Sequence, residues 1–325
     1  MEASVFVTRR IPEIGIELLR RNFAVEVFSG DGAIGRNTLL KKVSGCDALI
    51  SLLSDRIDEE VLAAGSRLKI VANYAVGYNN IDVAAAGQRN ILVTNTPGVL
   101  TNATGEIAFA LLITLTRKII AADRFTREGK FSGWDPLLLL GDELKGKTMG
   151  ILGMGRIGMD MAAKCRAFGM NIIYYNRKPV SKEIENSVDA IYCSLDQLLA
   201  QSDAISIHTP LTTDTFHLID SNSFEKMKSG VYLINTSRGE VVDEAALAAN
   251  LKSGKVKGAG LDVYEHEPAI HPALLDLPNV VLLPHIGSAT VETRAKMSQM
   301  AARNVIAALT GERPENIVPE LAIQT

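Results

Sequence analysis

The sequence predicts an α/β protein that contains two doubly wound parallel sheets, with one domain inserted into the other. Short apolar runs alternate with helix-compatible stretches along most of the chain, which is typical of parallel sheets covered by helices. A glycine-rich segment at residues 150–158 lies between an apolar run and a helical pattern. The length of 325 residues leaves room for about two domains.

The first hundred residues predict a small open parallel sheet with helices on both faces. Strands are expected at 5–8, 25–28, 48–52, 69–72 and 91–94, and helices at 12–21, 58–64 and 82–89. Asn95-Thr-Pro-Gly98 then marks a turn or linker. Because a final helix at 291–309 is expected to pack back onto this sheet, we expect a first domain of residues 1–98 plus 288–325.

Residues 99–287 are expected to form the second domain. Six strands are expected, at 149–152, 171–175, 204–208, 231–235, 258–262 and 280–283. Six strands are the number of a complete dinucleotide-binding fold. A long helix from about residue 101, apolar on most faces over 106–120, and a protruding arm at 124–147 precede them.

The order of elements around Gly153, Gly155 and Gly158 is the one that dinucleotide binding requires. In this G-x-G-x-x-G pattern the first glycine allows a tight turn, the second lets the backbone approach a pyrophosphate, and the third lets helix and strand pack closely. The helix dipole and free N–H groups favour negative charge at the helix start. We therefore expect the cofactor phosphates there, beside Arg156.

A second G-x-G-x-x-G, at residues 30–35, is interpreted as a glycine turn. The strand before it alternates apolar and charged residues, which indicates half exposure. Asp31 inside this loop would repel a pyrophosphate, and the helix that follows is short and polar.

The end of the second strand of the second domain bears on cofactor choice, because an acidic residue there selects NAD. No Asp or Glu lies between Met170 and Lys182, and Asn176 stands where the acid is expected. Arg177 and Lys178 follow, and arginine suits a phosphate dianion. We expect NADP (NADPH) to be favoured, with NAD possible; the alternative is a solvated basic turn without preference.

Composition argues against several other functions. A net charge of −3 gives no reason to expect binding to nucleic acid or to an anionic membrane. Three scattered cysteines show no zinc spacing, so no metal site is expected, and they fit a reducing compartment. The N-terminus lacks the pattern of a signal peptide and the longest apolar stretch, 107–113, is too short to span a bilayer. We expect a cytoplasmic protein.

Residues suited to reducing a 2-keto acid lie at expected strand ends, where ligands of such folds bind. Arg238 can hold a carboxylate and polarise a ketone, and His285 can donate a proton. Glu267, hydrogen-bonded to that histidine, would orient the ring and favour its charged form. Of five histidines only His208 and His285 lie directly at expected strand ends. On spacing alone two alternatives stay open: a structural role for the histidine, and a position in a surface turn for Arg238.

Four segments together form a specific pattern: GMGRIG at 153–158, NTSRG at 235–239, GLDVYEHEP at 260–268 and PHIGSA at 284–289. With them the chain resembles the D-isomer-specific 2-hydroxyacid dehydrogenase family over essentially its whole length. Segments 95–106 and 133–141 are most similar to the glyoxylate/hydroxypyruvate reductases of that family. The resemblance implies a Rossmann domain inserted into a smaller flavodoxin-like substrate domain. It also implies reduction of glyoxylate to glycolate, and of hydroxypyruvate to D-glycerate.

The resemblance implies roles for individual residues. Arg238 matches the substrate-binding arginine, Glu267 the carboxylate partner and His285 the general acid. Backbone amides of Val76 and Gly77 match a loop that holds the substrate carboxylate, and Leu53 borders the pocket. Asp262 matches an acid that contacts the nicotinamide carboxamide. The expected cofactor contacts are Gly153, Gly155, Arg156, Ile157, Gly158, Asn176, Arg177, Lys178, His208, Thr209, Pro210, Thr236, Ser237, Asp262 and Gly287.

The family also implies a homodimer joined through the helix and arm at about 101–145, where Trp134 either reaches a neighbouring active site or packs at the interface. Two other functions stay open. One is a dehydrogenase of another D-2-hydroxy acid such as D-3-phosphoglycerate, although segments 52–54 and 74–79 offer no obvious cation for a phosphate. The other is a non-catalytic, dinucleotide-sensing binding protein.

Overall fold

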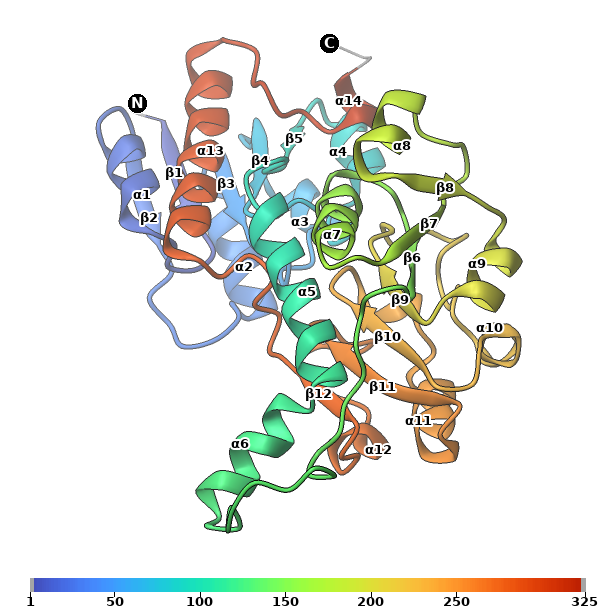
Figure 1. The fold of residues 1–325 in the computed structure, drawn as a ribbon. Coiled ribbons are helices and arrows are strands. Elements are labelled where there is room, and N and C mark those ends of the chain that lie inside the picture. Colours follow the sequence, from blue (N-terminus) through green and yellow to red (C-terminus); the bar gives the residue numbers. More distant parts are fainter. Residues whose placement is uncertain (1–2, 323–325) are drawn as a thin grey trace. The chain divides into compact units, whose positions relative to one another are not determined.

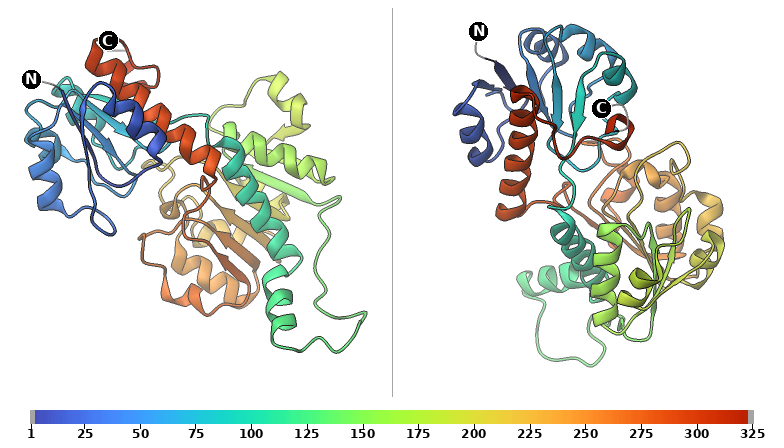
Figure 2. Two further views of the ribbon diagram at one scale, coloured as in Figure 1. Left: turned by 90° about the vertical axis from the view of Figure 1, so that its left-hand side faces the viewer. Right: turned by 90° about the horizontal axis from the view of Figure 1, so that it is seen from above.

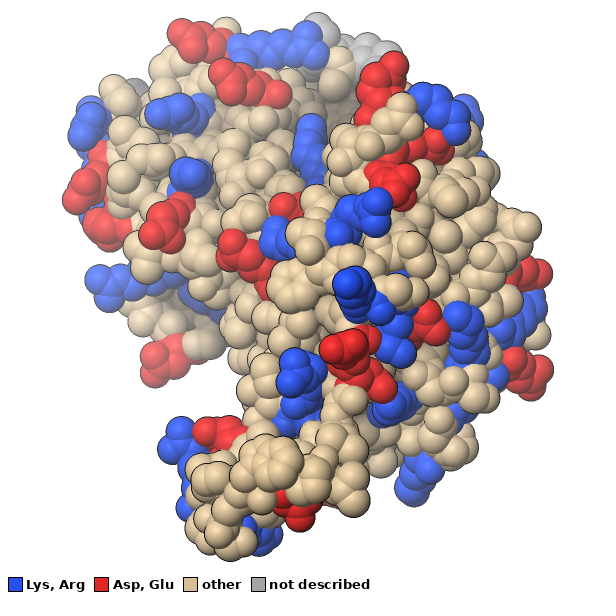
Figure 3. Space-filling view, viewed as in Figure 1, with Lys and Arg blue, Asp and Glu red and all other residues tan. Residues whose placement is uncertain are grey.

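The computed structural model describes residues 3–322 and divides them into two compact units (Figure 1). Unit 1 contains the described residues up to Leu100 and those from Ser288 onward, and unit 2 contains Thr101–Gly287. Each unit has its own parallel sheet. Charges of both signs are interspersed over the face shown in Figure 3, in keeping with the small net charge.

The sheet of unit 1 has five parallel strands in the order β2-β1-β3-β4-β5, which is the flavodoxin-like order. The strands are β1 (Ser4–Val7), β2 (Ala24–Val27), β3 (Ala48–Ser51), β4 (Ile70–Asn73) and β5 (Leu92–Thr94). Every residue of β3 and β4 is buried, whereas the edge strand β2 alternates between exposed and half-buried residues, as its sequence indicates.

Helix α13 completes unit 1 by packing against α1, and Figure 2 shows the two side by side. The helices of this unit are α1 (Glu13–Arg20), α2 (Arg36–Val43), α3 (Glu59–Ala64), α4 (Val83–Gln88), α13 (Val291–Thr310) and α14 (Pro319–Ala322). The contact is close, because a Cβ atom on Gly15 would lie 2.2 Å from Ser298 Oγ. Ser298 Oγ donates a hydrogen bond to the carbonyl of Pro12 at 2.7 Å.

Unit 2 contains a seven-stranded parallel sheet in the order β12-β11-β10-β9-β6-β7-β8. The strands are β6 (Thr148–Leu152), β7 (Asn171–Tyr175), β8 (Ala190–Tyr192), β9 (Ala204–Ile207), β10 (Val231–Asn235), β11 (Val256–Leu261) and β12 (Val280–Leu282). Counted from β6, this is the Rossmann order 3-2-1-4-5-6 with one strand added. The predicted fold class is confirmed. The expected count of six strands is wrong, because β8 was missed.

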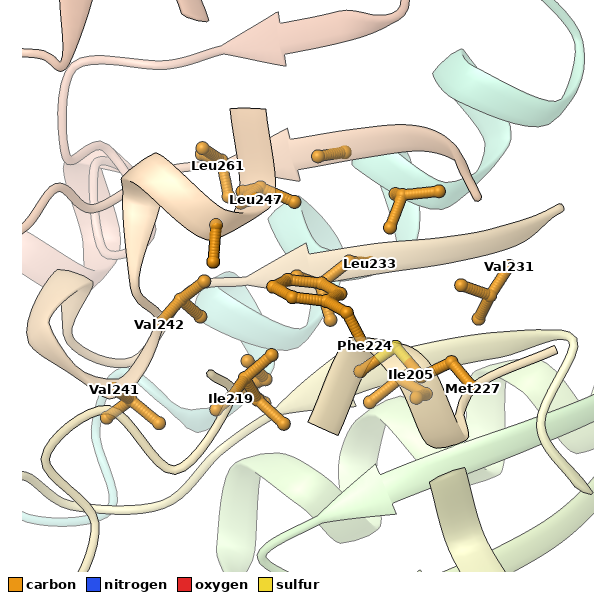
Figure 4. Packing of buried hydrophobic residues seen from close by; sticks show 14 of the residues in the cluster. Ile205, Ile219, Phe224, Met227, Val231, Leu233, Val241, Val242, Leu247 and Leu261 are labelled. Atoms are coloured by element: carbon orange, nitrogen blue, oxygen red, sulfur yellow. The ribbon is translucent and has the colours of Figure 1, made fainter. Parts of the chain in front are cut away.

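Helices cover both faces of this sheet. They are α5 (Thr101–Thr116), α6 (Ile119–Arg127), α7 (Arg156–Ala167), α8 (Lys182–Val188), α9 (Leu195–Gln201), α10 (Ser221–Lys226), α11 (Glu244–Ser253) and α12 (Pro272–Leu275), with a 3-10 turn at Gly239–Val241. Leu233 of β10 packs with Phe224 and Leu247 on one face (Figure 4), while its neighbour Ile234 packs with Leu112 on the other. This alternation is the two-residue period of a strand.

The long helix expected over 106–120 is interrupted, which corrects the prediction. Helix α5 ends at Thr116, and Lys118 has a left-handed backbone with φ of 54°. The cause is a contact with the returning chain, since the amide of Asp142 donates to the carbonyl of Thr116 at 2.8 Å. The next helix, α6, buries none of its residues and extends with the following segment away from the rest of unit 2 (Figure 1).

No helix within residues 3–322 is long and apolar enough to cross a membrane.

Replacing Gly15 with alanine should destabilise unit 1. The added Cβ would lie 2.2 Å from Ser298 Oγ and 2.4 Å from its carbonyl oxygen, so α1 and α13 must separate. Overpacking of this kind costs about 1–3 kcal/mol of unfolding free energy, which exceeds the gain in helix propensity. Urea unfolding of Gly15→Ala measures the loss. Gly45→Ala is the control, because its Cβ would meet only Lys42 O at 3.8 Å; equal losses in both variants would contradict the packing argument.

Candidate active site

The three glycines of the G-x-G-x-x-G at residues 153–158 have three different geometries in unit 2. Gly153 has φ of +97°, a conformation that side chains rarely adopt. A Cβ on Gly158 would lie 2.1 Å from the carbonyl oxygen of Gly153, so helix α7 touches the turn directly. Gly155 faces open space and is the N-cap of α7, which begins with Arg156 and Ile157. This turn provides the room and the free helix end that a pyrophosphate needs.

Asn176, at the end of β7, belongs to the same turn. Its Oδ1 accepts a hydrogen bond from the amide of Met154 at 2.7 Å. The exposed side chains of Arg177 and Lys178 follow directly. Within residues 3–322 neither of them forms an ion pair, so both charges are available to a ligand.

Two buried hydroxyl groups of unit 2 have no hydrogen-bond partner within the described chain: Oγ1 of Thr209, after β9, and Oγ1 of Thr236, after β10. Such groups are costly unless something satisfies them. They follow neighbouring strands of the sheet, and exposed Pro210 and half-buried Ser237 lie next to them. Unpaired polar atoms at this edge fit a bound dinucleotide.

His208, also at the end of β9, is neutral. Its Nε2 lies 2.8 Å from Ser206 Oγ. Burial lowers the pKa of His208 to about 3. A Cβ on Gly153 would lie 2.8 Å from the His208 carbonyl carbon, which places this histidine directly beside the glycine turn.

Asp262 fixes the turn that carries His285. Its carboxylate is buried after β11 and accepts the amides of Ile286 and Gly287, each at 2.7 Å. Burial raises the pKa of Asp262, and the two amide hydrogen bonds oppose that rise. His285 itself has φ of +54°, a strained conformation for a non-glycine residue.

The ring of His285 meets Glu267, as the sequence predicted. Nδ1 of His285 lies 2.8 Å from Oε2 and 3.1 Å from Oε1 of Glu267, and Oε1 also accepts the amide of Tyr264 at 3.0 Å. Burial raises the pKa of Glu267, but the hydrogen bond and charge of His285 outweigh it and leave the pKa below its usual value. With Nδ1 engaged, Nε2 is the atom through which His285 can exchange a proton with a reactant.

Arg238 lies close enough for its charge to act on Glu267. Asn235 holds the turn that contains it, donating from Nδ2 to the Arg238 carbonyl at 2.8 Å and accepting the amide of Ser237 at 3.0 Å. Desolvation lowers the pKa of Arg238, and the charges of Glu240 and Glu267 oppose this effect. An arginine, a histidine and a carboxylate are thus gathered at one edge of unit 2.

In unit 1 the carbonyls of Val76 and Gly77 are held by side chains. Asn95 Nδ2 donates to the Val76 carbonyl at 2.7 Å, and Asn73 Nδ2 donates to the Gly77 carbonyl at 2.8 Å. The amides of both residues donate to no other group among residues 3–322, so they remain available to an anion. Leu53, after β3, is 37% exposed.

The fold and these side chains are those of a dinucleotide-dependent dehydrogenase. The model of the D-isomer specific 2-hydroxyacid dehydrogenase NAD-binding domain matches residues 109–287, and the chain belongs to this family of oxidoreductases. The resemblance noted in the sequence is therefore confirmed.

Relatives and solved structures of similar length agree with this assignment. The chain is 49% identical to a glyoxylate reductase of Thermococcus litoralis, over 98% of this chain and 97% of that protein. A crystal structure of a glyoxylate reductase from Paecilomyes thermophila is 36% identical with a TM-score of 0.89, covering 98% and 99% of the two chains. An NADPH-dependent glyoxylate/hydroxypyruvate reductase from Sinorhizobium meliloti, solved with NADP and malonate, is 32% identical with a TM-score of 0.87, covering 98% of each chain.

The free energy of unfolding should depend on pH through His208. Its pKa is about 3 in the folded protein, against 6.5 for an ordinary histidine. Between these values the unfolded chain binds a proton that the folded chain does not, so stability falls as pH falls, by at most about 1.4 kcal/mol per pH unit. Chemical unfolding between pH 7 and pH 4 should show a shallower slope for His208→Asn than for the unsubstituted protein. The exposed-histidine control His266→Gln should keep the original slope. Identical slopes for all three proteins would contradict the lowered pKa of His208.

Proposed function

We propose that this enzyme reduces glyoxylate to glycolate, and hydroxypyruvate to D-glycerate, with NADPH favoured over NADH. The observation that carries the proposal is the hydrogen-bonded pair of His285 and Glu267 beside Arg238, in the unit that holds the glycine turn. The names of the T. litoralis and S. meliloti relatives support the choice of substrates.

Each group has a role that follows from its chemistry. Arg238 and the amides of Val76 and Gly77 bind the carboxylate of the keto acid and polarise its ketone. When bound, the reduced nicotinamide supplies the hydride that reaches the keto carbon. His285 donates a proton from Nε2 to the oxygen of that carbon, and Glu267 stabilises the charged ring before transfer.

The cofactor contacts follow from unit 2. We propose that the glycine turn, with the amides of Arg156, Ile157 and Gly158, binds the pyrophosphate, and that Arg177 and Lys178 bind a 2′-phosphate while Asn176 replaces the acid that selects NAD. The remaining contacts are proposed to come from His208, Thr209, Pro210, Thr236, Ser237, Asp262 and Gly287. The S. meliloti structure, described with NADP, supports this choice of cofactor.

We further propose that unit 1, apart from the linker residues 99–100, is the substrate-binding domain, that unit 2 is the dinucleotide-binding domain, and that the protein is a cytoplasmic homodimer. Helix α6 and the following arm expose large apolar side chains, among them Trp134 at 85% and Leu137 at 76%, and such patches mark protein interfaces. The second copy of the chain would cover them. Sedimentation of the protein as a monomer at micromolar concentration would contradict this assembly.

Steady-state reduction of glyoxylate and hydroxypyruvate with NADPH and with NADH tests the reaction and the cofactor together. We expect turnover with a lower KM for NADPH. The double substitution Arg177→Ala/Lys178→Ala should raise the KM for NADPH at least tenfold and change that for NADH little, because each charge-assisted contact to phosphate is worth about 1.5–3 kcal/mol.

The outcomes of this experiment separate the parts of the proposal. Equal use of both cofactors by the unsubstituted enzyme would contradict the phosphate contacts and leave the reductase intact. No turnover of either keto acid with either cofactor would contradict the reductase itself and favour a larger 2-keto acid or a binding protein.

Replacing His285 with glutamine should lower kcat for glyoxylate by about 10²–10⁴, because the ring is the proposed proton donor. The KM for NADPH should change far less, since His285 is outside the proposed cofactor contacts. His266 is an exposed histidine two residues after Tyr264. Its replacement, His266→Gln, is the matched control and should keep the original kcat. A His285→Gln enzyme that retains most of its kcat would rule out the acid role.

A further inference from the structure

Arg9, which the site described above does not use, lies at the carboxyl edge of the sheet in unit 1. It follows β1 by two residues, is half-buried, and its Nη2 lies 3.5 Å from Ser54 Oγ, a marginal hydrogen bond. Its Nε atom is buried and has no hydrogen-bond partner within the described chain. A guanidinium has five N–H donors, so most of the donors of Arg9 are unused.

Neighbouring contacts explain why Arg9 lacks a carboxylate partner. Asp55, the first acidic residue after β3, is buried. Its carboxylate already accepts hydrogen bonds from the hydroxyl of Thr8 and from the amide of Leu52, the latter at 2.7 Å. Among residues 3–322 no ion pair includes Arg9. Asp55 thus ties the end of β1 to the loop after β3 and sets Arg9 beside Ser54, without neutralising its charge.

The loop that Arg9 contacts is tied to the Val76–Gly77 loop. Asn80 Nδ2 donates to the carbonyls of Leu52 and Asp55 at 3.1 and 3.0 Å. Asn73 Nδ2 donates to the Gly77 carbonyl at 2.8 Å and to Asn80 Oδ1 at 3.2 Å. Strands β1, β3 and β4 are neighbours in the sheet. The unpaired guanidinium of Arg9 and the two free amides of the Val76–Gly77 loop therefore lie at the same edge of the sheet, and side-chain hydrogen bonds connect the loops that carry them.

We propose that Arg9 is a specificity-determining residue that binds an oxygen-bearing substituent on the carbon next to the ketone, so that hydroxypyruvate is preferred to pyruvate. This proposal rests on the proposed function. If Val76 and Gly77 bind the substrate carboxylate, a substituent that reaches past Leu53 meets the free donors of Arg9. A hydroxyl group can accept such a hydrogen bond, whereas the methyl group of pyruvate leaves the donors unsatisfied.

Arg9 supplies a cation to an edge of unit 1 where the sequence predicts none. Segments 52–54 and 74–79 contain no cation, but the segment after β1 contains Arg9, because β1 ends at the same edge. Arg9 would accept a carboxylate or phosphate at this position as well, and stronger binding is expected for these anions than for a hydroxyl.

The test compares kcat/KM for hydroxypyruvate and for pyruvate, which differ by one hydroxyl group. Arg9→Gln should lower the ratio of the two values about tenfold or more, mainly through the KM for hydroxypyruvate, because a charged donor is lost. Arg10→Gln is the matched control: Arg10 is the next residue, is exposed and forms no ion pair among the residues described. Its ratio should stay within about twofold of the original.

Two results separate the role of Arg9 from the proposed function. An unchanged ratio in Arg9→Gln, with glyoxylate still reduced, would overturn the role of Arg9 and leave the proposed function intact. Failure of the unsubstituted enzyme to reduce glyoxylate would overturn the proposed function itself. If Arg9→Gln does not fold, as judged by circular dichroism, Arg9→Lys takes its place. The ratio should then fall by a smaller factor, because an ammonium lacks the forked donors, and no fall would overturn the proposal.

Discussion

The position of His285 depends on two backbone hydrogen bonds accepted by one buried carboxylate. Asp262 binds the amides of Ile286 and Gly287, and these follow a histidine whose φ is +54°. A left-handed non-glycine residue costs on the order of 1–3 kcal/mol, and hydrogen bonds to a charged group contribute about 1.5–3 kcal/mol each, enough to hold the turn. Without this turn the ring would not meet Glu267.

Parallel topology then gathers residues that lie far apart in the sequence. Thr209, Thr236, Asp262 and His285 follow four strands, β9 to β12, that are neighbours in the sheet of unit 2. The glycine turn follows β6, next to β9, where the strand order reverses, and ligands of such folds bind at this point. In unit 1 the same geometry places Arg9 and the Val76–Gly77 loop on one edge. The residues proposed to bind the cofactor, to donate the proton and to determine specificity all lie where they do because strands end there.

Both sheets could be predicted from the sequence, because buried parallel strands are apolar runs that local patterns reveal. Strand β8 could not, because two of its three residues are exposed, with Ile191 at 67%, so it does not form a buried apolar run. The break after Thr116 depends on a contact with Asp142, which no local pattern encodes. The sequence predicts His285, Glu267 and Arg238 as site residues from their places near strand ends. Arg9 also follows a strand, β1, but the lack of a hydrogen-bond partner for its Nε, on which its proposed role depends, is visible only in three dimensions.

A crystal structure of the Asp262→Asn variant tests most directly the claim that this carboxylate holds His285 in place. An asparagine can accept only one of the two amide hydrogen bonds, because its NH2 group faces the other N–H. We expect that φ of His285 leaves the left-handed region in this variant and that Nδ1 moves beyond hydrogen-bonding distance of Glu267. An unchanged turn, with the 2.8 Å contact retained, would contradict it.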